Sequence, residues 1–248
     1  MSARTGVIAM VFVAVVTGCQ APEPPENIPA YPLTDAKQTL GLLAEHAHRV
    51  KTLSGEGLIT LTRRSGESVR LDAAIAMAPP DRARIRAWKL GRAVFDLTVL
   101  PEGVWAVMPD EPKRQDDIRS AGVSAARLAK TWSVLSGGFF DNADLQTDIR
   151  GQKLLITRRV AGEPTVVCEV ERPTLTPRKY SLLDDRGATR FTFTLGRYRQ
   201  FDDDVVWPTR LVVDSASGKV EIELRDVEVN PELPPGAFVA PRRAEKLP

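Results

Sequence analysis

The chain has few residues of the types that usually carry catalysis or bind metals. Its 248 residues include only two cysteines and two histidines. His46 and His48 are two positions apart, so on a helix they point about 200° from each other and cannot share a metal ion. The sequence contains no nucleophile elbow, HExxH motif, glycine-rich phosphate loop or CxxC pair. These absences predict a protein that is not an enzyme and that uses no cofactor or metal.

The sequence also lacks an excess of charge of either sign. It has 34 lysines and arginines against 32 aspartates and glutamates. Proteins that bind nucleic acid through their phosphates usually carry a clear basic excess. We therefore expect no nucleic-acid partner.

One long apolar run is present, and it lies at the N-terminus. Residues Gly6–Val16 contain no charged side chain and follow Arg4. The run is shorter than the roughly 20 residues that a membrane-spanning helix needs, but it fits the apolar region of a signal peptide. It ends at Val16-Thr17-Gly18-Cys19, which resembles the lipobox of bacterial lipoprotein precursors. That resemblance implies cleavage after a signal peptide of residues 1–18, lipidation of Cys19, and anchoring to a membrane through this residue. Because Gln20 and not Asp follows the cysteine, it also implies the periplasmic face of the outer membrane.

A proline-rich segment follows the cysteine. Five prolines lie between Gln20 and Leu33. Proline at this density favours an extended, semi-rigid tether, which we assign to residues 19–33. We expect one folded domain over residues 34–240 and a flexible tail over residues 241–248. The second cysteine, Cys168, lies in the β-like run Val166–Val170 and is expected to be a small buried residue.

Two helices are expected in the domain. Thr34 is a plausible N-cap for the first, whose apolar face recurs at helical spacing at Leu40, Leu43, Ala47 and Val50. The second is expected within Val123–Leu135, before the Gly137-Gly138 pair.

The rest of the domain alternates apolar and polar residues, as half-buried strands do. Clear examples lie within 69–77, 95–99, 191–195 and 220–224, and short turns containing glycine separate the runs. Such turns predict hairpins between sequence neighbours. Apolar parity slips between Leu224 and Val227, which predicts a β-bulge near Arg225-Asp226.

These patterns predict an α+β, mainly β fold. We expect a single curved antiparallel sheet, a half-open β-barrel of about 11 strands, covered by two or three helices. The apolar face of such a sheet must be shielded from water. It either packs into a filled core or leaves an apolar cavity of lipid size, and the sequence leaves both alternatives open.

The order of these elements over residues 34–230 resembles the LolA/LolB superfamily of bacterial lipoprotein carriers and receptors. The best local similarity is Arg82–Leu97, with further similarity in Val206–Leu211 and Leu224–Asn230. In the LolB-like members, an exposed leucine on a loop helps to insert lipoproteins into the outer membrane. The resemblance places that leucine at Leu90, flanked by Lys89 and Arg92; Lys89 stands where LolB tends to have proline.

The resemblance implies binding of acyl chains of lipoproteins or lipids in an apolar cavity and their delivery to the outer membrane. A soluble periplasmic carrier is then a candidate partner. The alternative is a structural or sensory envelope lipoprotein whose barrel is filled by its own side chains. Arg82, Arg84 and Arg86 share one face of a predicted strand, either as a solvated surface or as a contact for anionic headgroups. The cavity candidates are Val69, Leu71, Ile75, Trp88, Phe95, Leu97, Trp105, Trp132, Phe191, Phe193, Ile222 and Leu224.

Overall fold

The computed structural model of the chain describes residues 26–107, 137–142 and 144–247. Within these residues there is one α-helix, α1 (Ala36–Arg49), a short 3-10 helix, η2 (Asp202–Asp204), and one sheet of thirteen strands. The strands are β1 (Leu53–Arg63), β2 (Ser68–Ala78), β3 (Arg82–Lys89), β4 (Arg92–Leu100), β5 (Gly103–Val107), β6 (Leu145–Arg150), β7 (Lys153–Arg158), β8 (Thr165–Glu171), β9 (Thr176–Leu183), β10 (Thr189–Gln200), β11 (Val206–Ser215), β12 (Gly218–Val229) and β13 (Glu245–Lys246).

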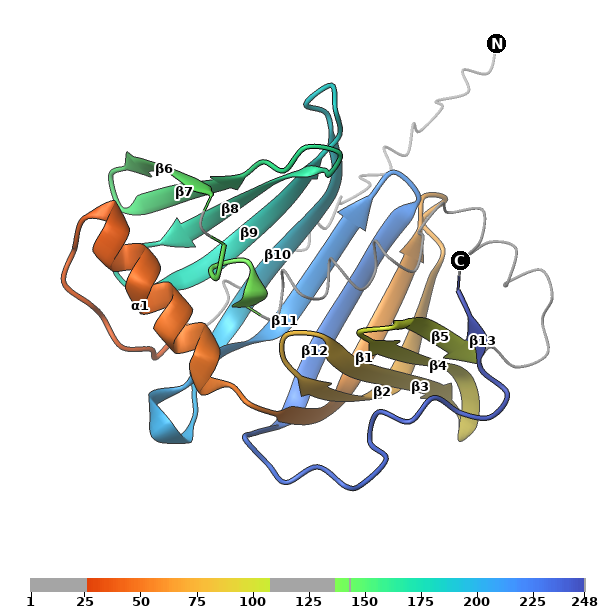
Figure 1. Cartoon of the computed structure of the whole chain (residues 1–248). Helices are drawn as coiled ribbons and strands as arrows, with labels where there is room; N and C mark the ends of the chain where they lie inside the picture. Colours follow the sequence, from red (N-terminus) through yellow and green to blue (C-terminus); the bar gives the residue numbers. More distant parts are fainter. Residues whose placement is uncertain (1–25, 108–136, 143, 248) are drawn as a thin grey trace, which may run out of the picture.

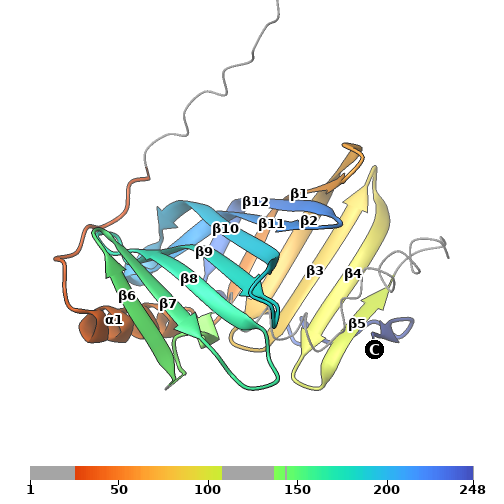
Figure 2. The same cartoon turned by 90° about the horizontal axis from the view of Figure 1, so that it is seen from above.

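The sheet is antiparallel throughout and open at both ends. Its strand order is β13-β5-β4-β3-β2-β1-β12-β11-β10-β9-β8-β7-β6, so the two hairpin-connected series meet where β1 pairs with β12. The sheet curves into a trough, and α1 lies on its concave side against the β6–β10 half (Figures 1 and 2). The prediction of one curved antiparallel sheet is confirmed.

The N-cap of helix α1 lies one residue later than predicted. Asp35, not Thr34, is the N-cap, and its carboxylate accepts a hydrogen bond from the Gln38 amide at 2.8 Å. A carboxylate satisfies a free amide and also interacts favourably with the helix dipole, whereas the Thr34 hydroxyl bonds to Thr39. The buried Leu43 anchors the apolar face of the helix to the sheet.

The predicted bulge is confirmed. Glu56 pairs with Asp226 and Gly57 with Leu224, so Arg225 is the additional residue on β12. Gly57 lies opposite this bulge, where a methyl group would come within 2.0 Å of the Glu223 carbonyl oxygen. Only glycine fits there, and the bulge keeps Val227 on the buried face.

The predicted counts of strands and helices are wrong for the described residues. The sheet has thirteen strands, not about 11, and one α-helix covers it, not two or three. One unforeseen strand is β13, inside the segment expected to be a tail, where Glu245 and Lys246 pair with β5. A two-residue strand is held by backbone bonds and shows no side-chain alternation. The second helix, expected within 123–135, lies outside the described residues.

Apolar side chains form two large clusters on the concave side. The helix-side cluster joins α1 to β7–β10 and includes Leu43, Phe139 and Tyr180. The central cluster lies over β1–β3 and β12 and includes Leu53, Ile59 and Leu71. Leu211 on β11 packs against both clusters, so the space between them is bounded by apolar side chains from each.

Candidate ligand pocket

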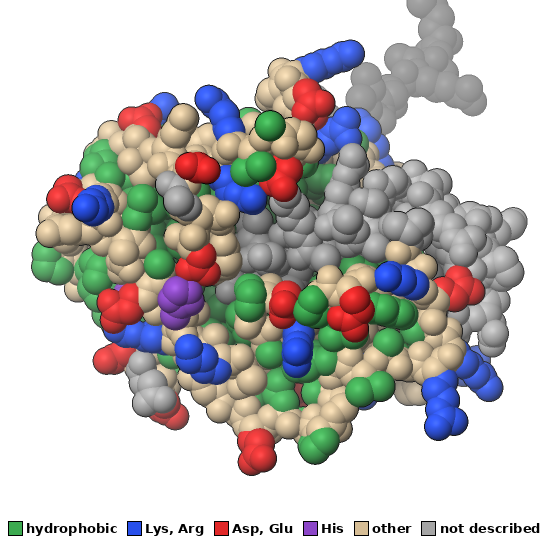
Figure 3. Space-filling view, viewed as in Figure 1, with side chains coloured by type: hydrophobic (Ala, Val, Ile, Leu, Met, Phe, Trp, Pro, Cys, Tyr) green, Lys and Arg blue, Asp and Glu red, His purple; other side chains and the backbone are tan. Residues whose placement is uncertain are grey.

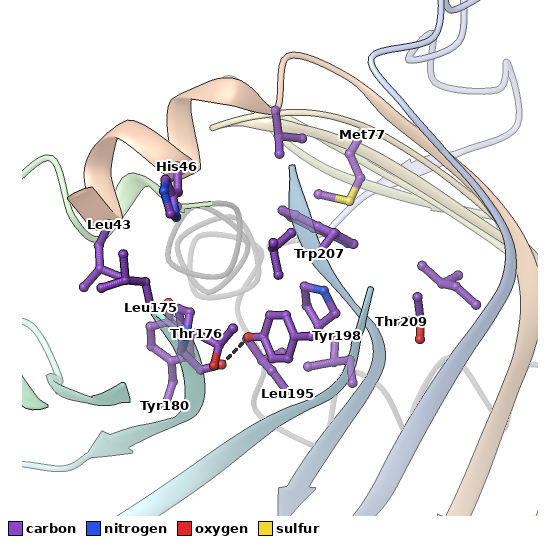
Figure 4. Close-up of a pocket in the computed structure, with 18 of the residues that line it drawn as sticks. Leu43, His46, Met77, Leu175, Thr176, Tyr180, Leu195, Tyr198, Trp207 and Thr209 are labelled. Carbon is purple, nitrogen blue, oxygen red and sulfur yellow. Dashed lines mark hydrogen bonds between the residues drawn. The ribbon is translucent and has the colours of Figure 1, made fainter. Parts of the chain in front are cut away.

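An apolar pocket of about 120 Å³ lies between the two clusters, under the C-terminal end of α1. Figure 4 shows Leu43 and His46 of α1 on one side, Met77 of β2 on another, and Tyr198 and Trp207 of β10 and β11 between them. No aspartate, glutamate, lysine or arginine is among the described residues that line it. The pocket is therefore suited to an uncharged, apolar ligand group.

Most polar groups in the pocket wall are occupied by the protein. The Tyr198 hydroxyl donates to the Pro177 carbonyl, and the Thr209 hydroxyl donates to the Arg197 carbonyl at 2.7 Å (Figure 4 draws the first). The Thr176 hydroxyl shares a 2.7 Å hydrogen bond with Thr174. Because these groups already have partners, a ligand gains little by hydrogen bonding to them, and burial of apolar surface is the main interaction left.

Among the described residues that line the pocket, His46 is the one titratable side chain apart from the tyrosines. Its ring packs on Tyr31 with centroids 5.2 Å apart. Burial lowers the pKa of His46, and the neighbouring Arg49 lowers it further. The imidazole is therefore neutral at physiological pH, in keeping with a wall that carries no charge.

The structure brings three of the predicted cavity residues to this pocket: Ile75, Ile222 and Leu224. Val69, Leu71 and Phe95 pack in the central cluster and Phe191 and Phe193 in the helix-side cluster. Leu97 packs on a small third cluster with Val99 and Val104.

Two of the predicted tryptophans, Trp88 and Trp105, lie away from the pocket. Trp88 follows the buried Ala87 on β3, so strand alternation turns it to the outer face of the sheet. Trp105 follows the buried Val104, and its ring lies 5.4 Å from the Lys246 ammonium. Trp132 lies outside the described residues, as do Cys19 and the signal segment 1–18.

Several pocket residues were not among the sequence candidates, chiefly Tyr180, Leu195, Tyr198 and Trp207. Tyr198 was hidden because Arg197 has a positive φ of 53°, which shifts the alternation that runs through Phe193 and Leu195. The sequence does point to Leu195 and Met77 as buried residues, since both belong to runs in which apolar and polar residues alternate. Their nearness to the helix was not visible in local patterns.

Leu90 lies at the tip of the β3–β4 hairpin. It is 92% exposed, the highest value among the large hydrophobic side chains of the described residues. Leu90 and Gly91 both have positive φ, 50° and 75°, which is the geometry of a two-residue hairpin turn. Lys89 and Arg92 pair at the base of this turn, so two cations flank the exposed leucine.

The three arginines of β3 differ in their contacts. Arg84 forms a two-pronged ion pair with Asp96 on β4, at 2.7 and 2.9 Å, whereas Arg82 and Arg86 are exposed. On the face seen in Figure 3, acidic and basic side chains are interspersed and do not gather into a field of one sign.

Cys168 is fully buried, as predicted. Burial raises the pKa of its thiol, which therefore stays protonated beside Tyr180. Within the described part of the chain, no group of three or more histidine, cysteine, aspartate or glutamate side chains is arranged to hold a metal. The same residues include no helix long and apolar enough to cross a bilayer.

Known structures with similar folds were found, although no family model and no curated protein matches the sequence. A domain assigned to outer membrane lipoprotein sorting from Vibrio parahaemolyticus is 13% identical, with a TM-score of 0.58 over 83% of this chain and 97% of that one. A LolA superfamily protein from Nitrosomonas europaea is also 13% identical, with a TM-score of 0.55 over 83% and 98%. A DUF1329 family protein from Desulfovibrio piger is 12% identical, with a TM-score of 0.59 over 83% and 98%. The chain has a LolA-like fold.

Proposed function

We propose that this protein is a non-enzymatic, membrane-anchored carrier or receptor that binds acyl chains of lipoproteins or lipids. Its site is the apolar pocket between α1 and the concave face of the sheet. The observation that carries the proposal is the pocket wall: the described lining residues hold no formal charge, and the hydroxyls of Thr176, Tyr198 and Thr209 are hydrogen-bonded within the protein. Each acyl methylene removed from water there contributes about 0.8 kcal/mol.

The size of the pocket limits how much of a chain it holds. Its volume of about 120 Å³ is close to the roughly 150 Å³ of an engineered apolar cavity that accepts benzene. A few methylene groups fit, so a whole acyl chain requires α1 to move away from the sheet. Affinity should therefore rise with chain length and then level off.

Two features support delivery to a membrane. The lipobox-like end of the signal segment supports an anchor at Cys19 in the outer membrane. The exposed Leu90, between two cations, has the chemistry to enter a lipid surface while Lys89 and Arg92 meet phosphates. The similar structures from Vibrio and Nitrosomonas, one named for outer membrane lipoprotein sorting and one a LolA superfamily protein, agree with this role.

The direct test uses the Cys19→Ser chain, which cannot be acylated at this position. Lipid extracted from the purified protein is identified by mass spectrometry, and a fluorescent fatty-acyl probe is titrated. We expect saturable probe binding that is at least about tenfold weaker in Leu211→Trp, because the indole narrows the pocket. Leu61→Trp is the matched control, since Leu61 packs on the central cluster but does not line the pocket.

A protein that binds neither lipid nor the probe would support the alternative of an envelope lipoprotein with a filled barrel. If no lipid co-purifies and the probe does not bind the parent chain, the carrier proposal is wrong. Equal effects of the two tryptophans would show that binding occurs elsewhere.

A further inference from the structure

A second cavity, of about 560 Å³, lies on the face of the sheet opposite the apolar pocket. Its floor is Ala74 and Ala76 on β2, which alternate with the buried Ala73, Ile75 and Met77. The segment Leu233–Ala237, after β12, covers it from outside. We call this cavity the outer cleft.

The walls of the outer cleft carry opposite charges. The backbone register is Asp226, Glu56, Ala74 and Arg86 in one row across β12, β1, β2 and β3. Carboxylates therefore stand on one side of the small alanine floor and a guanidinium on the other. Glu228, two residues beyond Asp226, adds a third carboxylate to the acidic wall.

The cover of the cleft is fixed at both ends. At one end the Asn230 side chain accepts from the Lys51 amide at 2.7 Å, and the Thr52 hydroxyl donates to the Pro231 carbonyl at 2.7 Å. At the other end Arg84 donates to the Ala237 carbonyl at 3.4 Å, and β13 pairs with β5. The cleft is thus partly covered by a segment that the rest of the fold holds in place.

Among the described residues, no lysine or arginine pairs with Glu56 or Asp226 of the acidic wall. Glu56 and Asp226 are directly opposite each other on neighbouring strands, an arrangement that destabilises a sheet when both carry the same charge. Among the described residues neither has a hydrogen bond or ion pair through its carboxylate. Elsewhere on the same face, Glu221 pairs with Arg210 at 2.7 Å and Glu223 with Arg197 at 2.9 Å. A bound cation would remove the repulsion.

The basic wall offers one available guanidinium. Asp96 is already engaged by Arg84, so the exposed Arg86 makes no ion pair within the described part of the chain. The acidic wall also belongs to no metal-ligand group among those residues. A single organic ligand that carries both a cationic and an anionic group can pair with the carboxylates of one wall and the guanidinium of the other.

We propose that the outer cleft binds a short peptide with free ends. Its ammonium group lies between Glu56 and Asp226, and its carboxylate forms a bidentate pair with Arg86. The distance from β1 to β3 is two strand spacings, about 10 Å. An extended chain spans about 3.3–3.6 Å per residue, so a tripeptide bridges the two walls.

The test titrates the full-length protein with trialanine in a calorimeter. We expect saturable binding that is weakened at least about tenfold by Glu56→Gln and by Arg86→Gln, as for the loss of a charge-assisted contact. Asp72→Asn and Arg82→Gln are matched controls, because both residues are exposed on the same face of β2 and β3 but outside the cleft. Neither control should change the affinity.

A second measurement needs no variant. N-acetyl-trialanine and trialanine amide each lose one end charge, and both should bind the parent protein at least about tenfold more weakly. Absence of trialanine binding, equal binding of the capped peptides, or tighter binding of phosphoethanolamine would overturn the proposal. Binding of the acyl probe to the pocket is independent, since Glu56 and Arg86 do not line it.

Discussion

At the scale of single residues, Leu90 breaks a local rule. Leucine fits the left-handed backbone region poorly, and turns of this type prefer asparagine or glycine. Leu90 is nevertheless there, with φ of 50° and almost no contact to the fold. Positions that cost stability without a packing gain are where function is expected.

Replacing Leu90 with asparagine should therefore separate stability from function. We expect Leu90→Asn to raise the free energy of unfolding by about 0.5–1 kcal/mol, measured by urea denaturation, because asparagine tolerates positive φ. The same variant should reduce transfer of a lipoprotein to liposomes. Val160→Asn, at another exposed apolar position, is the control. Unchanged transfer by Leu90→Asn would make Leu90 an ordinary turn residue.

His46 should make both stability and binding depend on pH. Since burial lowers the pKa of His46 in the folded state, the unfolded chain binds its proton more tightly. This histidine therefore costs no stability above its ordinary pKa of about 6.5, and destabilises the fold as pH falls below that value. A proton there also places a charge in the apolar pocket.

We expect thermal stability and acyl-probe affinity to fall together as the pH falls below about 6.5, and the fall to be smaller in His46→Gln. His48→Gln should retain the full pH dependence of the parent chain, since His48 does not line the pocket. A fall of the same size in both variants would assign the effect to other groups.

At the scale of elements, the bulge on β12 and the glycine opposite it act together. Arg225 adds a residue to one strand, and Gly57 leaves room for the displaced backbone of Glu223. The result is that Leu224 reaches the pocket while Asp226 reaches the outer face. One irregularity thus serves both faces of the sheet.

A pair of glycine substitutions tests this arrangement. Gly57→Ala should lower the free energy of unfolding by about 2 kcal/mol or more, because the new methyl group overlaps the Glu223 backbone. Gly41→Ala, within α1 and with nothing within 4 Å, should raise it by about 1 kcal/mol through helix propensity. Both changes are read from chemical denaturation. Similar effects of the two would exclude a steric role for Gly57.

The elements that sequence reasoning identified are those with a regular side-chain period. The α1 face around Leu43 and the alternation through Phe193 were visible because local geometry determines them. The positive φ of Arg197 and the two-residue β13 were not, because tertiary contacts and backbone pairing determine them. For the same reason Ile222 was assigned to the concave face correctly, whereas its neighbours in the pocket from β9 and β11 were not foreseen.

At the scale of the whole molecule, the two faces of one sheet carry different chemistry. The concave face holds an uncharged pocket, and the outer face holds a cleft with opposed charges. The alternation of side chains makes this possible without a second domain. The anchor proposed at Cys19 and the hairpin tip at Leu90 would present these two faces beside a membrane.

The anchor can be tested on the intact chain. Metabolic labelling with an alkyne fatty acid should tag the parent protein and not Cys19→Ser, and the variant should move from the membrane to the soluble fraction. Cys168→Ser should keep both the label and the membrane location, although the buried hydroxyl should lower stability by about 1–3 kcal/mol. Equal labelling of the parent and Cys19→Ser would place the lipid on another residue.

The ladder between β1 and β12 has a consequence for how the molecule forms. Leu53 near the start of the domain pairs with Val229 near its end, and this junction joins the two halves of the sheet. Pairing over such a long sequence separation is slow, because loop-closure entropy must be lost before the contacts form. Until synthesis has reached β12, β1 has only one strand partner and its other edge stays open to wrong pairing. The last long strand therefore controls when the nascent chain becomes resistant to aggregation.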